Sequence, residues 1–87
     1  MSDPRALRFT RSAQKELRRL DPPVRTRILV ALDRLIAEDG PLDVRRLTGS
    51  EQYRLRVGDW RVIFDHEPNT HTILVRHVLP RGRAYER

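Results

Sequence analysis

The sequence of 87 residues contains no cysteine, a single lysine and few aromatic side chains. Without cysteine, a disulfide framework and a thiolate metal site are both excluded. No apolar run approaches the ~20 residues that a membrane-spanning helix needs, and Met1–Arg5 lacks the apolar core of a signal peptide. We therefore expect a cytoplasmic protein that does not associate with membranes.

Motifs that bind cofactors or metals are missing as well. The sequence has no glycine-rich phosphate loop and no serine nucleophile motif. Its histidines, His66, His71 and His77, do not have the i, i+4 helical spacing of a metal pair, and no carboxylate cluster accompanies them. We expect neither a metal nor a small-molecule cofactor.

Arginine dominates the charge that is present. It supplies 17 of the 18 basic residues, and the formal net charge is +6. The segment from Arg45 to Arg87 holds nine basic and five acidic residues, so it carries most of the excess. Because a guanidinium can bind a phosphate with two parallel hydrogen bonds, this excess indicates a nucleic acid or another polyanion as partner. A basic surface that serves only solubility would give the same net charge.

The apolar spacing predicts a strand, two helices and three further strands within one domain, residues 1–87. The first strand covers residues 7–9, and Thr10 can cap the first helix. Asp21 and Pro22 are typical of the start of a second helix, which Gly40 and Pro41 end. We expect a loop from 41 to 50, anchored by Leu47. The order β-α-α-β-β-β predicts an α+β fold, with a two-helix hairpin packed on a small, mainly antiparallel sheet.

The second helix contains a run, residues 28–32, that is apolar on all sides. One interpretation is a well-buried helix packed by the first helix. The other is that Leu29 and Ile36 help to form an exposed groove for a segment of a partner.

Residues 53–64 predict a tight hairpin. Apolar and polar positions alternate on both sides of Gly58 and Asp59, and glycine at the first turn position suits a type II′ turn. This turn places Arg56 opposite Arg61 on the polar face. Like charges directly across two strands destabilise the pair, so the two side chains need an acidic neighbour, water or an anionic ligand.

A third strand, residues 72–79, extends the pattern if its turn is centred on Pro68 and Asn69. The register then pairs Arg61 with Arg76 and Trp60 with His77. It gives a row of three arginines, Arg56, Arg61 and Arg76, with Arg54 beside the row. On this register His77 is a core histidine, and Trp60 fills the core rather than stacking on a base.

The motif resembles that of a known family. The residues that carry the resemblance are Leu47-x-Gly49-x-x-x-Tyr53-Arg54-Leu55-Arg56-x-Gly58-Asp59-Trp60-Arg61-Val62-Ile63-Phe64, followed by a basic stretch that ends in Tyr85. Together with the order of elements, they resemble the RelE/ParE toxin superfamily over nearly the whole chain.

The resemblance implies a toxin of a type II toxin–antitoxin system that a small cognate antitoxin neutralises. RelE-type members cleave mRNA in the ribosomal A site without a metal, whereas ParE-type members share the fold and poison DNA gyrase. The working positions of the ribosome-dependent nucleases map onto Arg54, Arg56, Arg61, Arg81 or Arg83, and Tyr85. The best-known member has lysine at the first two positions. Since a guanidinium keeps its proton (pKa above ~12), the resemblance does not carry a proton-transfer role to Arg54 and Arg56.

These considerations favour a metal-independent mRNA endonuclease that acts on the ribosome. In this hypothesis Arg61 and Arg81 stabilise the phosphorane, and Tyr85 removes the proton of the attacking 2′-OH. The remaining basic side chains of the site bind the RNA: Arg54, Arg56, Arg76 and Arg83. The alternatives are a gyrase inhibitor that is not an enzyme, and a nucleic-acid-binding module that is not toxic.

Overall fold

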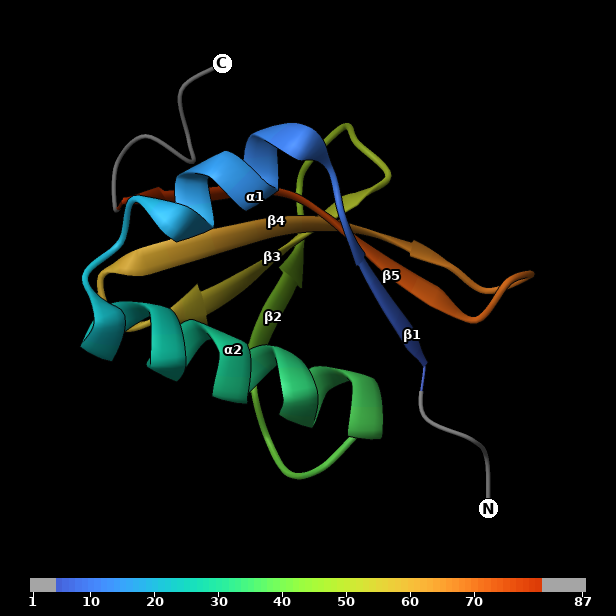
Figure 1. Ribbon diagram of the computed structural model, residues 1–87. Coiled ribbons are helices and arrows are strands. Elements are labelled where there is room, and N and C mark those ends of the chain that lie inside the picture. Colours follow the sequence, from blue (N-terminus) through green and yellow to red (C-terminus); the bar gives the residue numbers. More distant parts are fainter. Residues whose placement is uncertain (1–4, 81–87) are drawn as a thin grey trace.

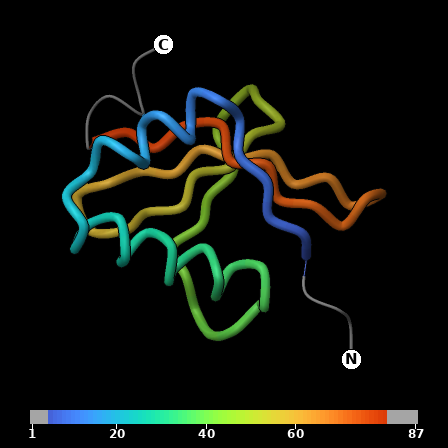
Figure 2. The backbone as a smooth tube through the Cα atoms, viewed as in Figure 1, coloured from blue at the N-terminus to red at the C-terminus, as the bar shows by residue number. Residues whose placement is uncertain are grey.

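A computed structural model describes residues 5–80, in which two helices lie on one face of a sheet (Figure 1). Within these residues the sheet has five strands in the order β1-β5-β4-β3-β2. Only β1 and β5 are parallel, and they lie side by side although they are far apart in sequence (Figure 2). The architecture confirms the α+β prediction. The elements are β1 (Ala6–Phe9), α1 (Arg11–Arg18), α2 (Pro22–Ala37), β2 (Asp43–Arg46), β3 (Gln52–Val57), β4 (Trp60–Glu67) and β5 (Thr72–Pro80).

Both helices begin at the residues that the sequence indicates. The Thr10 hydroxyl accepts a hydrogen bond from the Ala13 N–H at 3.1 Å, which caps α1. Asp21 is the N-cap of α2 by its backbone alone, since its side chain makes no capping bond, and Pro22 takes the first helical position. The helix ends earlier than predicted, because Glu38 adopts the left-handed conformation (φ 54°) before Gly40 is reached.

The expected loop from 41 to 50 was only partly right, because it contains the edge strand β2. Val44 pairs with Leu55 of β3 and packs against the core, while Asp43 and Arg45 lie on the other face. Four residues with one central apolar side chain give too short an alternation to be recognised in a sequence. Leu47, the predicted anchor, is half-buried just after the strand.

The hairpin of β3 and β4 has the predicted register. Arg56 lies opposite Arg61, and the neighbouring pairs Val57 with Trp60 and Leu55 with Val62 also form. Gly58 has a φ of 59°, and Asp59 has no positive φ, as a type II′ turn requires. Trp60 packs against the core, as expected.

The predicted register between β4 and β5 was wrong. The connecting turn covers residues 68–71, so Phe64 pairs with Val75 instead of Ile73. A β-bulge between Ile63 and Phe64 then leaves Arg76 as an extra residue on β5. The bulge allows Val75 and Val78, three residues apart, both to be buried.

Two predictions fail for the same reason. Beyond the bulge every side chain of β5 lies on the face opposite to the predicted one. Leu79, not Arg76, lies opposite Arg61, so the row of three arginines does not form. His77 lies opposite Ile63 and is exposed, so it is not a core histidine.

One apolar cluster joins both helices to the sheet. The run in α2 is buried on the side that faces the strands, which supports the first interpretation of that run, and Ile36 packs against the same core. Val30, 53% exposed, is the large apolar side chain of residues 5–80 that remains open to solvent. No helix within these residues is long and apolar enough to cross a membrane. The buried members are Ala13, Leu20, Ile28, Leu32, Leu35, Leu55, Val62, Phe64, Ile73, Val75 and Val78.

Substitutions at buried and at exposed apolar positions should differ in their effect on stability. Leu55→Ala should lower the free energy of unfolding by about 2–5 kcal/mol, because Leu55 is fully buried and its truncation leaves a cavity. Val30→Ala, at the exposed position of α2, should change it by less than ~0.5 kcal/mol. Urea unfolding monitored by circular dichroism measures both changes. Equal losses would contradict the assignment of the core.

Candidate functional site

The face of the sheet opposite the helices gathers arginines from three neighbouring strands. Arg45 of β2 pairs with Arg54 of β3, and Arg56 of β3 pairs with Arg61 of β4. Paired residues project on the same side of a sheet, and neither described helix covers this side (Figure 1). We call these four residues, together with Asp43, the arginine face.

Asp43 balances the charge of two of these arginines. Its Oδ1 accepts a hydrogen bond from Arg54 Nη2 at 3.2 Å, and its Oδ2 lies 3.9 Å from Arg56 Nη1. Arg54 is only 9% exposed, whereas about half of the Arg56 side chain is open to solvent. Arg54 is therefore held in place, and Arg56 can reach a ligand.

Arg61 is the most buried cation of the arginine face, at 4% exposure. Its Nη1 donates to the carbonyl oxygens of Gly58 at 3.3 Å and Trp60 at 3.2 Å. The guanidinium therefore folds back over the hairpin turn and is fixed in direction by the backbone. A cation fixed in this way loses little side-chain entropy when an anion binds.

Arg76 is not part of the arginine face. Because it occupies the bulge, it is not paired with Arg61, and its Nε donates to Asp65 Oδ2 at 2.6 Å. The structure thus brings together Arg54, Arg56 and Arg61 but not Arg76. Three predicted site residues, Arg81, Arg83 and Tyr85, lie outside the described residues.

Two arginines outside the predicted site also lie on this side of the sheet. Arg45 becomes part of the site only once β2 is recognised, and a single apolar residue, Val44, between polar neighbours is too short a pattern to indicate that strand. Arg8 of β1 pairs with Leu74, whereas its neighbours Leu7 and Phe9 pack against the core. The alternation in residues 7–9 is sufficient to place Arg8 on the outer side.

The edge of β5 is bound by α1. Strand β1 ends opposite Val75, so the outer edge of β5 beyond that residue has no neighbouring strand. Thr10 follows β1 and donates to the Val75 and Arg76 carbonyl oxygens from its N–H and hydroxyl, at 2.9 and 3.1 Å. Glu16 then accepts the Val78 N–H at 2.8 Å, and its other oxygen lies 3.3 Å from His77 Nδ1.

A second charged group lies at the opposite end of the sheet. Burial lowers the pKa of His66, the positive charges of Arg5 and His71 lower it further, and the Glu38 carboxylate partly opposes them. Arg5 donates to the Leu35 carbonyl oxygen and lies 3.6 Å from Glu38. These contacts connect β1 to the end of α2, so this cluster is structural rather than part of the arginine face.

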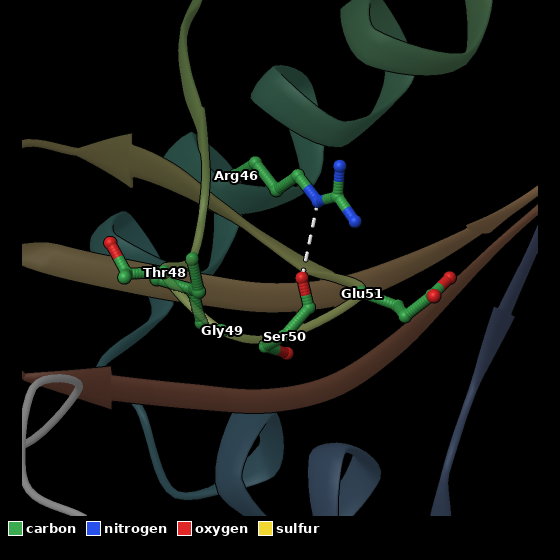
Figure 3. Close-up of a pocket in the computed structure, with 6 residues that line it drawn as sticks. Arg46, Thr48, Gly49, Ser50 and Glu51 are labelled. Carbon is green, nitrogen blue, oxygen red and sulfur yellow. Dashed lines mark hydrogen bonds between the residues drawn. The ribbon is translucent and has the colours of Figure 1, made fainter.

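A surface pocket at the β2–β3 loop does not bring together side chains that could act on one ligand (Figure 3). Arg46 Nε donates to the Ser50 carbonyl oxygen at 3.1 Å, and the Ser50 hydroxyl accepts from the Gln52 N–H. The side chains of Arg46, Thr48 and Glu51 point in different directions. No group of three metal-binding side chains occurs in residues 5–80.

Comparisons with known proteins agree with this architecture. The family model described as the ParE toxin of the type II toxin–antitoxin system parDE matches residues 7–85. The archaeal RelE–RelB complex from Pyrococcus horikoshii contains a chain with 30% identity and a TM-score of 0.79, and the match covers 93% of this chain and 99% of that one. No match was found among curated protein sequences.

Two further structures show the same arrangement. The RelB–RelE antitoxin–toxin complex from Methanococcus jannaschii matches with 26% identity and a TM-score of 0.72, over 90% of this chain and 94% of that one. The isolated RelE toxin from E. coli matches with 21% identity and a TM-score of 0.75, over 93% and 88%. The last likeness shows the fold alone.

The His66 cluster predicts a pH dependence of stability. Because its pKa in the folded chain lies below the ordinary value of ~6.5, the unfolded chain binds the proton first as the pH falls. The contribution of His66 is therefore complete above pH ~6.5 and is lost as the pH falls through the folded pKa. His66→Gln should unfold with a weaker pH dependence than wild type in urea titrations between pH ~7.5 and ~5. Identical dependences would show that His66 does not contribute.

Proposed function

Because the chain belongs to the RelE/ParE superfamily of type II toxin–antitoxin toxins, we propose that it is an endoribonuclease that cleaves mRNA on the ribosome without a metal. The observation that carries this proposal is the arginine face. It holds Arg54, Arg56 and Arg61 on adjacent strands, at the positions that correspond to working residues of the ribosome-dependent nucleases. The substrate places this activity in the cytoplasm.

The arginine face fits the charge demands of RNA cleavage. When the 2′-oxygen attacks the adjacent phosphorus, negative charge develops on the phosphorane oxygens, and cations held in place beforehand stabilise it. Arg61 is such a cation, since two backbone carbonyl groups fix its direction. In the proposal Arg81 assists it from the C-terminal segment, and Tyr85 accepts the proton of the 2′-OH.

The outer arginines bind the RNA chain in this proposal. Arg56 is half-exposed, and its contact with Asp43 is loose at 3.9 Å, so a phosphate can replace the carboxylate. Arg45 extends the positive surface across β2. Arg54, Arg76 and Arg83 complete the predicted set, although Arg76 must first leave Asp65 to take part.

An antitoxin is the second proposed partner. The P. horikoshii and M. jannaschii relatives are solved as complexes with RelB. In this chain the exposed Val30 and the neighbouring, half-buried Leu29 form a small apolar patch on α2. We propose that an antitoxin helix covers this patch and that acidic antitoxin groups approach the arginine face.

The family model supports one alternative. It describes a ParE toxin, and ParE-type members of the superfamily poison DNA gyrase rather than cleave RNA. Induced expression in a host that lacks the antitoxin distinguishes the two functions. The proposed function predicts new mRNA 5′ ends within translated codons, whereas the alternative predicts gyrase-dependent DNA breaks and intact mRNA. Growth without either effect would leave a nucleic-acid-binding module that is not toxic.

The role of Arg56 can be tested by the salt dependence of binding. Arg56→Ala should weaken binding to ribosomes and lower the slope of log Kd against log salt by roughly 1, because one phosphate contact is lost. The fold should survive, since Asp43 keeps Arg54 and the repulsion with Arg61 disappears. Filter binding over a salt series gives both quantities.

Arg11→Ala is the matched control, because it removes the same charge from α1, on the other side of the sheet. Equal effects of the two changes would mean that net charge, and not the arginine face, determines binding.

Two substitutions test the chemical step. Tyr85→Phe removes only the hydroxyl and should slow mRNA cleavage roughly 10²–10⁴-fold without weakening ribosome binding. Arg61→Lys should also impair cleavage, because an ammonium cannot make two parallel contacts with a phosphate. Single-turnover cleavage of a programmed ribosome gives the rates, and added chelator should not change them. Full activity of Tyr85→Phe would exclude the phenol as the base.

A further inference from the structure

Glu16 and His77 form a carboxylate–histidine pair at the border of the arginine face. The two residues are 61 positions apart in sequence, and α1 brings the carboxylate of Glu16 to the edge of β5. One oxygen accepts the Val78 N–H at 2.8 Å, and the other lies 3.3 Å from His77 Nδ1. The backbone contact fixes the carboxylate, so the orientation of the imidazole is fixed as well.

This contact determines which ring nitrogen carries a proton. An ionised carboxylate can only accept hydrogen bonds, so the Nδ1 that faces it must be the donor. Nε2 is then the nitrogen that can exchange a proton with a ligand, and it makes no hydrogen bond with residues 5–80. The His77 side chain is 46% exposed, so Nε2 is accessible. Histidine is the side chain that gains and loses a proton between pH 5 and 8.

The bulge at Arg76 places this pair beside the arginines. Residue His77 lies opposite Ile63, and Ile63 lies opposite Arg54 on its other side. Two strand spacings, about 10 Å, therefore separate the backbones of His77 and Arg54. A ribose and its phosphate can lie across this gap, with the Arg54 guanidinium held by Asp43 on the far side.

Cleavage by the 2′-oxygen needs two proton transfers, and the arginines can make neither of them. In the proposed function Tyr85 takes the proton of the 2′-OH. The 5′-oxygen, which leaves when its bond to phosphorus breaks, still needs a proton donor. Without one it would depart as an alkoxide of high energy.

We propose that His77 is the general acid that protonates this 5′-oxygen and that Glu16 is its positioning residue. The assignment rests on the proposed function and deepens it. The 2′-oxygen forms a bond to phosphorus, the bond from phosphorus to the 5′-oxygen breaks, and the Nε2 proton moves to the 5′-oxygen. The products are a 2′,3′-cyclic phosphate and a 5′-hydroxyl, and His77 is left neutral with Nδ1–H still bound to Glu16.

The test compares two mRNA substrates on programmed ribosomes. One carries the natural 5′-oxygen at the cleavage position, and the other carries sulfur there. Sulfur leaves as a thiolate without protonation, because thiols are far stronger acids than alcohols. His77→Asn keeps a donor that can face Glu16 and removes Nε2. It should cleave the natural substrate roughly 10²–10⁴-fold more slowly than wild type and the sulfur substrate within about tenfold of wild type.

Glu16→Gln tests the positioning role. The amide can still accept the Val78 N–H, but it no longer offers a negative charge to His77. Its cleavage of the natural substrate should be slower by roughly tenfold or more, again with recovery on the sulfur substrate. His71→Asn is the control: it removes a histidine at the other end of the hairpin, where asparagine tolerates the φ of 54°, and it should match wild type on both substrates.

The outcomes distinguish a failure of the His77 assignment from a failure of the proposed function. If His77→Asn is fully active, or equally slow on both substrates while wild type cleaves them, His77 is not the general acid and the proposed function still stands. If wild type cleaves neither substrate, the proposed function fails and this assignment fails with it.

Discussion

Hydrogen bonds with Thr10 and with Glu16 of α1 hold the outer edge of β5, the strand that joins β1 to the antiparallel part of the sheet. Strand β1 covers only the first half of β5, and the rest of that edge would expose polar backbone groups. Thr10 and Glu16 satisfy three of these groups, at Val75, Arg76 and Val78. A buried or half-buried backbone group without a partner costs about 1–3 kcal/mol. The first helix therefore stabilises the strand from which the C-terminal segment continues.

The arginine face shows how like charges can be kept close together. Arg56 and Arg61 lie directly opposite each other, an arrangement that is unfavourable by itself. Asp43 compensates on one side, and the carbonyl oxygens of the hairpin turn compensate on the other. Neither device removes the positive potential of the surface. The sheet therefore keeps a positively charged surface in place, and the short strand β2, which supplies Asp43, is part of that surface and not merely its border.

Much of this architecture could be predicted from the sequence. The local conformational preferences of Thr10, Pro22 and Gly58 determine the structure around them. The starts of both helices and the β3–β4 hairpin were therefore predicted correctly. The register of β5 could not be predicted from its turn, because a four-residue turn and a bulge each shift the pairing. The spacing of Ile73, Val75 and Val78, two and then three, is the sequence signal of that bulge.

Long-range contacts were harder to predict than local ones. Nothing in the neighbourhood of Glu16 indicates that it binds His77, because the contact depends on the length of β1 and on the position of α1 over β5. The same holds for Asp43, whose pairing with Arg54 requires a strand too short for periodicity to reveal. The tight β3–β4 hairpin brings Arg54, Arg56 and Arg61 together as predicted. Arg76 is separated from them by the turn and the bulge of the next hairpin.

The bulge at Arg76 also restricts how the chain length can change during evolution. If the extra residue stayed in the strand without the bulge, His77 would face the core and Val78 would face solvent, because side chains alternate between the faces of a strand. Deleting one residue between Val75 and Val78 would instead remove the bulge and leave both valines buried. A change in the length of the turn, residues 68–71, does not alter which side chains of β5 face the core, since those residues lie outside the paired ladder. Homologous chains should therefore differ freely in length at the tip of this hairpin, whereas those that lack the bulge should have one residue fewer between the positions of Val75 and Val78.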